Sequence, residues 1–160
     1  MSKAPSTPAT RLLKEHKVPF LEQLYRYEEH GGTKVCAREC NVDEHCVIKT
    51  LIMEDENAKP LVVLMHGDLE VSTKALARQI GCKTVQICKP EVAYKHSGYQ
   101  VGGTSPFGTR KALPVYMERT ILDLERILLN GGSRGFLVAM DPKDAIRILH
   151  PCLVEVALHE

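Results

Sequence analysis

The sequence predicts an α+β fold in a single domain that spans residues 1–160. Three observations support this prediction. The length is sufficient for one domain with a sizeable core. Apolar, strand-like runs are separated by short polar segments, as in hairpins. Capped helical segments lie among these runs, so we expect helices that flank one mixed, strongly curved sheet. The first residues, 1–6, are expected to form a flexible N-terminus.

Five helices are predicted from capping residues and helix breakers. Thr7 followed by Pro8 is a typical N-cap and first-turn pair. Gly31-Gly32 breaks the chain, and Thr33 is predicted to cap the helix that follows. Ser72 is a third N-cap. The expected helices cover, in chain order, residues 8–16, 34–40, 73–80, 90–96 and 142–150.

The strands are predicted from runs of apolar and β-branched residues. Two of these runs are separated only by EDENAK and therefore predict an antiparallel hairpin. Asn130-Gly131-Gly132 is predicted to turn the chain into the last strand. The expected strands cover residues 20–29, 46–53, 60–66, 84–88, 114–117, 127–129 and 136–140.

The composition argues against several classes of protein. The net charge is +1 and the pI about 7.7, whereas a protein that grips nucleic acid unaided usually has a clear basic excess. A nucleic-acid partner would therefore be held by a local patch, weakly or with help. No apolar run approaches the length of a membrane span, and the N-terminus lacks the apolar region of a signal peptide. We therefore expect a cytoplasmic protein without a membrane partner.

Six cysteines raise the question of disulfides or metal. A disulfide framework does not suit a chain without an export signal. Cys36, Cys40, His45 and Cys46 are potential zinc ligands, but their spacing is not the paired C-x2-C pattern of zinc sites. We expect reduced thiols that pack as small hydrophobes, and no metal or other cofactor.

A lysine interrupts one of the most apolar runs of the sequence. In residues 46–53, both faces of the expected strand are apolar apart from Lys49 and Thr50. A buried ammonium group is costly without a partner. Either Lys49 reaches water along its stem from an edge strand, which is the commoner arrangement, or its amine points into a polar cavity. The second case would mark a functional site.

A glycine-rich stretch is the second candidate site. Gly98, Gly102, Gly103 and Gly108 surround Ser105-Pro106, in a pattern that matches neither common nucleotide-binding loop. No serine-hydrolase elbow or catalytic triad is apparent. Glycines let the backbone approach a ligand and aim N–H groups at an anion, so the stretch is either a ligand cradle or a tight surface loop. Basic residues near it favour a phosphate ligand: Lys89, Lys95, His96, Arg110, Lys111 and Arg134.

Five segments together carry a resemblance to a known family: VIKTLIM, LVVLMHGDLEVSTKALARQIG, KPEVAYKHSGYQVGGTSPFGTRKALP, NGGSRGF and DPKDAIRIL. They resemble the YbaK/EbsC family of aminoacyl-tRNA editing proteins, which is related to the insertion domain of bacterial prolyl-tRNA synthetase. The resemblance covers nearly the whole chain, and the glycine motif is similar to that of the Cys-tRNA(Pro) deacylase branch. It implies a barrel-like sheet and an enzyme that clears cysteine from mischarged tRNA(Pro) without a cofactor. It also implies tRNA rather than DNA as partner, and a transient complex with prolyl-tRNA synthetase.

The resemblance also implies roles for single residues. Lys49 and Gly102 are expected to be catalytic. Leu137 stands where the family often has an acidic residue, and an aromatic residue of some relatives is replaced near Gly31-Gly32. Both departures concern the shape of the pocket and therefore the amino acid that is cleared. The expected substrate-binding residues are Tyr25, Thr50, Gly103, Ser105, Asn130 and Gly132.

The resemblance further implies a reaction that needs no nucleophile from the enzyme. In this branch the thiol of the substrate cysteine is thought to attack its own ester carbonyl, which releases tRNA and a cyclic thiolactone. We expect Lys49 to place positive charge near the developing oxyanion, with help from the N–H groups of Gly102 and Gly103. Two alternatives remain: editing of another amino acid by water attack, and a module that binds a synthetase or a nucleotide-like ligand without turnover.

Overall fold

Hydrophobic strands form the centre of the fold. The structure, a computed structural model, describes residues 4–158. Five strands form a mixed sheet in the order β5-β2-β3-β6-β9, three form an antiparallel sheet in the order β1-β8-β7, and β4 pairs with β10. The strands are β1 (Leu21–Leu24), β2 (Ile48–Asp55), β3 (Pro60–His66), β4 (Glu70–Val71), β5 (Val85–Ile87), β6 (Val115–Glu118), β7 (Ile127–Ser133), β8 (Phe136–Met140), β9 (Cys152–Val154) and β10 (Ala157–Leu158).

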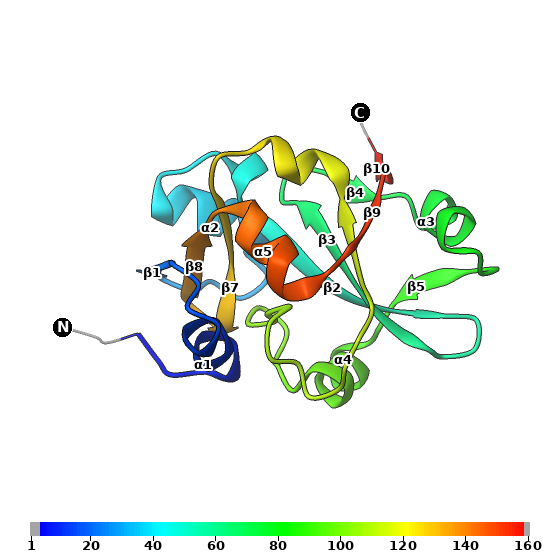
Figure 1. The fold of residues 1–160 in the computed structure, drawn as a ribbon, viewed down its shortest axis with the longest axis horizontal. Helices are drawn as coiled ribbons and strands as arrows, with labels where there is room; N and C mark the ends of the chain where they lie inside the picture. Colours follow the sequence, from blue (N-terminus) through cyan, green and yellow to red (C-terminus); the bar gives the residue numbers. More distant parts are fainter. Residues whose placement is uncertain (1–3, 159–160) are drawn as a thin grey trace.

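The predicted hairpin of β2 and β3 is confirmed, with Lys49 opposite Met65. Strand β3 then pairs in parallel with β6, and β6 with β9, which makes this sheet mixed. A bridge between Val47 and Leu128 joins the β2 end of the large sheet to β7. Through this bridge the two sheets continue into one strongly curved, mixed β-surface, as predicted (Figure 1).

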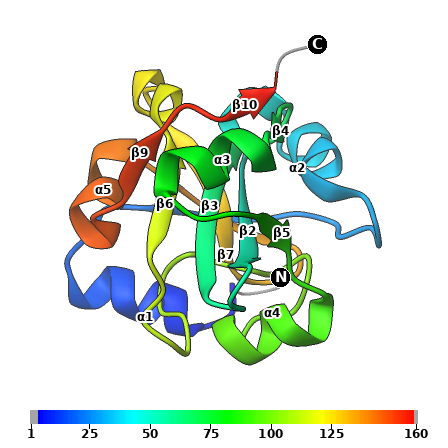
Figure 2. The ribbon, with the colours of Figure 1, turned by 90° about the vertical axis from the view of Figure 1, so that its right-hand side faces the viewer.

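Helices cover the ends and faces of the strands. The five α-helices are α1 (Pro8–Glu15), α2 (Gly32–Cys40), α3 (Thr73–Ile80), α4 (Pro90–Ser97) and α5 (Pro142–Leu149), and short 3-10 turns occupy Glu44–Cys46 and Arg119–Asp123. Thr7 forms a capping box with Thr10, and Ser72 accepts a hydrogen bond from the N–H of Ala75, so both predicted caps are confirmed. Figure 2 shows α1 and α4 together at one end of the central strands.

Two local predictions at the start of the chain are wrong. The expected strand over residues 20–29 is limited to β1, because its partner β8 ends where the β7–β8 hairpin turns, at Gly135. Thr33 does not cap α2, since the helix begins at Gly32 and Gly31 is the cap. The Thr33 hydroxyl instead donates to the Glu44 carboxylate at 2.8 Å, which ties α2 to the segment before β2.

The predicted turn at Asn130-Gly131-Gly132 is also wrong, because these residues belong to β7. The two-residue turn lies at Arg134 and Gly135, between the paired residues Ser133 and Phe136. The register of β7 shifts between Asn130 and Ser133, as in a β-bulge. Strands β9 and β10 were not expected from the sequence.

The main core lies between the curved sheet and α1, α4 and α5. Phe107 from the glycine-rich loop and Phe136 from β8 are fully buried there. Of the N-terminal residues expected to be flexible, 1–3 lie outside the described part, and Ala4 packs against this core. None of the helices described is long and apolar enough to span a membrane.

Candidate functional site

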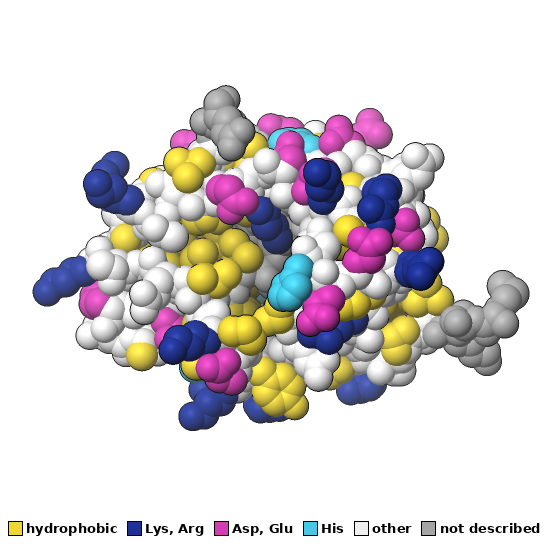
Figure 3. All heavy atoms as spheres, turned by 180° about the vertical axis from the view of Figure 1, so that it is seen from behind, with side chains coloured by type: hydrophobic (Ala, Val, Ile, Leu, Met, Phe, Trp, Pro, Cys, Tyr) yellow, Lys and Arg dark blue, Asp and Glu magenta, His cyan; other side chains and the backbone are white. Residues whose placement is uncertain are grey.

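A pocket of about 530 Å³ lies beside β2, between the segment that joins β1 to α2 and the glycine-rich loop after α4. Residues 48–52 of β2 line it, because β5 pairs only with residues 53–55 of that strand. On the face shown in Figure 3, hydrophobic side chains gather in a central hollow, with charged side chains around it. Of the predicted site residues, the structure brings five to this pocket: Tyr25, Lys49, Thr50, Gly102 and Asn130.

Lys49 lines the pocket, and its ammonium group pairs with an acid that is not part of the lining. Its side chain is 19% exposed, and Nζ donates to the carboxylate of Glu70 at 3.3 Å. The Glu70 side chain is 82% exposed, so water screens this ion pair, and such pairs contribute only about 0–1 kcal/mol. The ammonium group can therefore turn to an oxygen atom of a ligand at small cost. Lys49 is thus a partly buried residue at the pocket whose amine pairs with an exposed carboxylate of β4.

The unpaired edge of β2 presents backbone polar groups to the pocket. The carbonyl of Ile52 accepts from the N–H of Cys88 at 3.0 Å on the β5 side, and that of Val47 accepts from Gly67 at 2.7 Å on the β3 side. Because successive residues point their backbone groups to opposite edges, the N–H and carbonyl of Thr50 face the open edge with Ile52.

The Thr50 side chain adds a third polar group. Its hydroxyl is buried and has no hydrogen-bond partner within residues 4–158. A buried polar group left unsatisfied costs about 1–3 kcal/mol. Thr50 therefore presents two backbone groups at the open edge and a hydroxyl without a partner among residues 4–158.

The glycine-rich loop contributes Gly102 in a conformation that suits only glycine. Its φ is +88°, and a Cβ atom there would lie 2.7 Å from the Tyr27 hydroxyl. Its carbonyl accepts from Nδ2 of Asn130 at 2.9 Å. The N–H of Gly103 already donates to the carbonyl of Gln100 at 2.8 Å. Both N–H groups were expected to help stabilise an oxyanion. Because that of Gly103 is engaged, only the N–H of Gly102 is left for this role.

Asn130 braces this loop from β7. Its Oδ1 accepts from the N–H of Gly132 at 2.7 Å and from that of Ser133 at 3.1 Å, which stabilises the bulge. Its Nδ2 reaches the carbonyl of Gly102. Asn130 lines the pocket, and these bonds engage its Oδ1 and one of its two Nδ2–H groups, so its side chain positions Gly102.

Three predicted substrate-binding residues lie away from this pocket. Ser105 is fully buried, and its hydroxyl accepts from the N–H of Phe107 at 3.1 Å, so it shapes the loop. Gly103 and Gly132 line a separate cavity of about 200 Å³. A Cβ atom at Gly132 would lie 2.9 Å from the Tyr99 ring, so close packing accounts for this glycine.

Neutral groups line the part of the pocket near β8 and α2. Burial, with the Cys36 thiol nearby, raises the pKa of Tyr25 well above its ordinary value. Burial likewise raises the pKa of Cys36, so both groups stay protonated at neutral pH. Leu137, 2% exposed, adds an apolar wall. This part of the pocket suits a small uncharged side chain.

Of two further pocket residues, Tyr27 was missed from the sequence, and Arg134 was named only as one of several basic residues near the glycine-rich stretch. Tyr27 lies two residues beyond Tyr25, and the Arg134 guanidinium lies over its ring at 5.1 Å. Arg134 also donates from Nε to the carbonyl of Val101 at 2.9 Å. Its place in the NGGSRGF segment, next to Asn130, was the available signal. The contact with Tyr27 depends on the fold.

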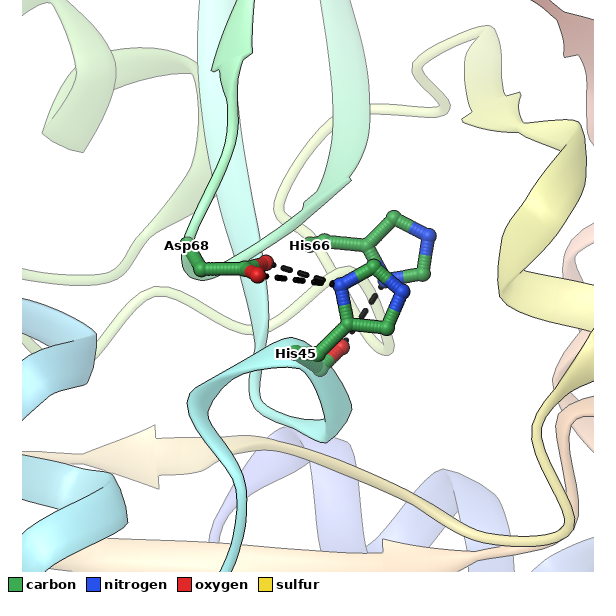
Figure 4. Close-up of side chains that lie close together, drawn as sticks. All are labelled: His45, His66 and Asp68. Atoms are coloured by element: carbon green, nitrogen blue, oxygen red, sulfur yellow. Dashed lines mark hydrogen bonds and ion pairs between the residues drawn. The ribbon is translucent and has the colours of Figure 1, made fainter. Parts of the chain in front are cut away.

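A histidine pair near the start of β2 is structural (Figure 4). His45 and His66 stack with ring centroids 3.7 Å apart and planes inclined by 5°, and Nδ1 of His45 lies 2.9 Å from the carboxylate of Asp68. His66 is buried with both ring nitrogens engaged, by the His45 carbonyl and the Thr120 hydroxyl, and burial lowers its pKa. Although the three side chains are close enough to be considered for a metal ion, the lone pairs of two stacked rings cannot converge on one ion.

A second cluster lies behind the pocket. Nε2 of His96 is 3.0 Å from the Glu54 carboxylate, and Nζ of Lys111 is 3.0 Å from Nδ1 of the same ring. Since the lysine donates to Nδ1, the proton of a neutral ring sits on Nε2 and points at Glu54, so neither nitrogen is free for a metal. Burial, with Glu54 nearby, raises the pKa of Cys88 to about 11 and keeps its thiol protonated. These two clusters are the close groups of metal-binding side chains among residues 4–158, and neither contains Cys36, Cys40 or Cys46.

Comparison with solved structures shows where the fold belongs. A crystal structure of the hypothetical protein APE2540 superposes with a TM-score of 0.87 over 95% of this chain and all of that one, at 18% identity. A protein described as a candidate trans-editing enzyme for prolyl-tRNA synthetase superposes with a TM-score of 0.82 over 98% of this chain and all of that one, also at 18% identity. At these identities the likeness shows a shared fold.

Comparison with characterised sequences adds the family. The EbsC protein of Enterococcus faecalis, named as a candidate Cys-tRNA(Pro)/Cys-tRNA(Cys) deacylase, is 26% identical over 96% of this chain and 94% of its own length. Proline–tRNA ligase of Geotalea daltonii is 32% identical over 60% of this chain, which corresponds to 17% of that enzyme. Residues 29–148 match the aminoacyl-tRNA editing domain. The chain belongs to the aminoacyl-tRNA editing domain family.

Proposed function

We propose that this protein is a deacylase that clears cysteine from mischarged tRNA(Pro), with the thiol of the substrate as nucleophile. The observation that supports the proposal is that Lys49 lines the same pocket as protonated thiols and a neutral phenol. EbsC, which is similar to this chain over almost its whole length, is named for deacylation of Cys-tRNA(Pro), and this supports the choice of substrate.

The pocket offers no activated nucleophile of its own. The pKa of Cys36 is raised by burial, and that of Cys88 is raised to about 11, so neither thiol is ionised at neutral pH. The substrate cysteine has an ordinary thiol pKa of about 8.5, so a few per cent is thiolate near pH 7. The substrate is therefore the better source of the attacking sulfur.

In the proposed step the substrate sulfur forms a bond to its own ester carbonyl carbon, and the bond from that carbon to the ribose oxygen breaks. The thiol proton is transferred to the departing ribose oxygen, so tRNA and a cysteine thiolactone are the products. The Lys49 ammonium group and the Gly102 N–H stabilise the negative charge on the carbonyl oxygen. The Thr50 edge holds the aminoacyl group so that sulfur and carbonyl meet.

The test is a single-turnover deacylation time course on Cys-tRNA(Pro). Lys49→Ala is expected to lower the rate by about 100- to 1000-fold, the loss typical of an oxyanion donor. Lys83→Ala, an exposed lysine that does not line the pocket, is the matched control and keeps the rate. A full rate in Lys49→Ala would exclude this role of the lysine.

A substrate analogue separates thiol attack from water attack. tRNA(Pro) carrying 2-aminobutyrate has a methyl group in place of the thiol and fills nearly the same space. Under the proposed mechanism it is not cleaved. Cleavage of this analogue at a rate similar to that of Cys-tRNA(Pro) would favour editing by water, and the apolar wall at Leu137 would then select a small side chain. No cleavage of any ester would favour a binding module.

The same proposal includes help from prolyl-tRNA synthetase in tRNA selection and action in the cytoplasm, where tRNA is charged. A net charge of +1 gives the chain little general attraction for tRNA. The similarity to segments of proline–tRNA ligases supports a related substrate. Adding the synthetase is expected to raise the rate on Cys-tRNA(Pro) relative to Cys-tRNA(Cys). An unchanged ratio of the two rates would contradict this part of the proposal.

A further inference from the structure

Arg134 is a permanent cation in the wall of the pocket, and the ion pairs formed within residues 4–158 do not include it. It lies at the tip of the β7–β8 hairpin and is exposed. Two acids also line the pocket: Glu28 is paired with Arg38 at 2.9 Å, and Glu29 lies 3.9 Å from His30. An unpaired guanidinium group beside an ester-cleaving pocket is suited to an anionic part of the substrate.

We propose that Arg134 binds the phosphate of the 3′-terminal nucleotide of tRNA and thereby sets the position of the aminoacyl ester. This inference rests on the proposed function, because it takes an aminoacyl-tRNA as the ligand. In such a substrate a single ribose separates the ester from the phosphate of the same nucleotide. A cation in the wall of the pocket that holds the aminoacyl group is therefore within the reach of that phosphate.

Two contacts hold the guanidinium group in place. Nε donates to the carbonyl of Val101 at 2.9 Å, and the group lies over the Tyr27 ring at 5.1 Å. Arginine has five N–H groups, so four remain on the two terminal nitrogens. A planar group that is fixed in this way can offer two parallel N–H bonds to a phosphate, which lysine cannot do.

The same contacts connect Arg134 to the expected oxyanion site. Val101 precedes Gly102, and the Tyr27 ring that supports the guanidinium group also packs against Gly102. Gly102 is held from the other side by Asn130. A phosphate bound at Arg134 is thus fixed relative to the Gly102 N–H, and the ribose between them places the ester carbonyl. Arg134 acts as a positioning residue that contacts the substrate away from the reacting atoms.

The experiment compares Arg134→Gln and Arg134→Lys on three cysteinyl esters: those of tRNA(Pro), adenosine 5′-monophosphate and adenosine. Arg134→Gln is expected to lower kcat/KM by about 10- to 100-fold on the two esters that carry the phosphate and by less than about threefold on the adenosine ester. Arg134→Lys should recover only part of the loss. The slope of log kcat/KM against log salt on the tRNA ester should become about 0.7 less steep. Arg78→Gln, on the exposed side of α3, is the matched control.

An equal loss on all three esters, or none, would overturn the inference. A binding measurement separates it from the proposed function. Titration of the protein with the trinucleotide CCA carrying a 5′-phosphate, followed by NMR, should shift the Nε–H signal of Arg134 and the N–H signal of Gly102, and Arg134→Gln should weaken binding about tenfold or more. If CCA binds in this way while no ester is cleaved, the proposed function fails and the inference stands. If Cys-tRNA(Pro) is cleaved and Arg134→Gln changes neither binding nor kcat/KM, the inference is wrong.

Discussion

Adding one methyl group at Gly102 tests how the pocket wall is built. In Gly102→Ala the new Cβ would lie 2.7 Å from the Tyr27 hydroxyl and 2.9 Å from a ring carbon of Tyr27, well inside van der Waals contact. The residue also has a φ of +88°, where an L-residue costs about 1–2 kcal/mol. Overpacking typically adds about 1–3 kcal/mol. The expected loss of unfolding free energy is therefore about 2–5 kcal/mol.

Gly81→Ala is the matched control for this substitution. Gly81 has a φ of +82°, almost the same as Gly102, but a Cβ there would have no atom within 4 Å. It therefore reports the backbone cost alone, about 1–2 kcal/mol. Urea unfolding of the two variants gives the difference, which we expect to be at least about 1 kcal/mol. Equal stabilities, together with a wild-type deacylation rate in Gly102→Ala, would refute the close contact between Gly102 and Tyr27.

Three further predictions concern the surroundings of the site. Phe107→Ala, which empties a fully buried position under the glycine-rich loop, should cost about 3–5 kcal/mol in urea unfolding. Burial lowers the pKa of His66 below its ordinary 6.5, so the unfolded chain binds more protons at this residue than the folded chain. The free energy of unfolding should therefore fall as the pH drops through about 6.5. Thermal melts between pH 5.5 and 7.5 should show a flatter pH dependence for His66→Gln. Iodoacetamide at pH 7.5 should label the exposed Cys152 well before Cys88, because the pKa of about 11 keeps Cys88 as a thiol. Mass spectrometry measures the labelling of each cysteine, and equal labelling rates would contradict this prediction.

The parts of the fold that could be predicted depend on local chemistry. The caps at Thr7 and Ser72 act within one turn of a helix, so the sequence alone indicates where α1 and α3 begin. The apolar runs around the EDENAK segment likewise predict the β2–β3 hairpin. Strands β9 and β10 could not be predicted in this way, because each is short and is stabilised by a distant partner strand.

The misplaced turn at Asn130-Gly131-Gly132 has a similar cause. A polar residue followed by two glycines is a typical turn signal. Here the Asn130 side chain satisfies two backbone N–H groups of its own strand and forms a bulge instead. The amide nitrogen of Asn130 then donates to the carbonyl of Gly102, a contact between segments that are far apart in the sequence.

The candidate site was predictable where a residue contradicts its surroundings. Lys49 stands out because an ammonium group in an apolar strand is costly without a partner, whereas the family resemblance singled out Gly102 among the glycines of its loop. Ser105 belongs to the same motif, but membership in a motif does not say which way a side chain points, and this one is buried. Tyr27 and Arg134 could not be paired from the sequence, because only the fold brings the turn between β7 and β8 beside the segment after β1.

The neutral part of the pocket, near β8 and α2, bears on how an editing enzyme would distinguish amino acids. Tyr25, Cys36 and Leu137 offer no charge, and a pocket of this kind separates side chains that differ by one methylene group by only about 10- to 200-fold. Shape alone would therefore discriminate poorly among cysteine, serine and alanine. A reaction in which the substrate supplies the nucleophile removes this limit, because alanine has no nucleophile and the hydroxyl of serine ionises far less readily than a thiol. With such chemistry a tolerant pocket is sufficient, and the positive charge of Lys49 matters more than a close fit.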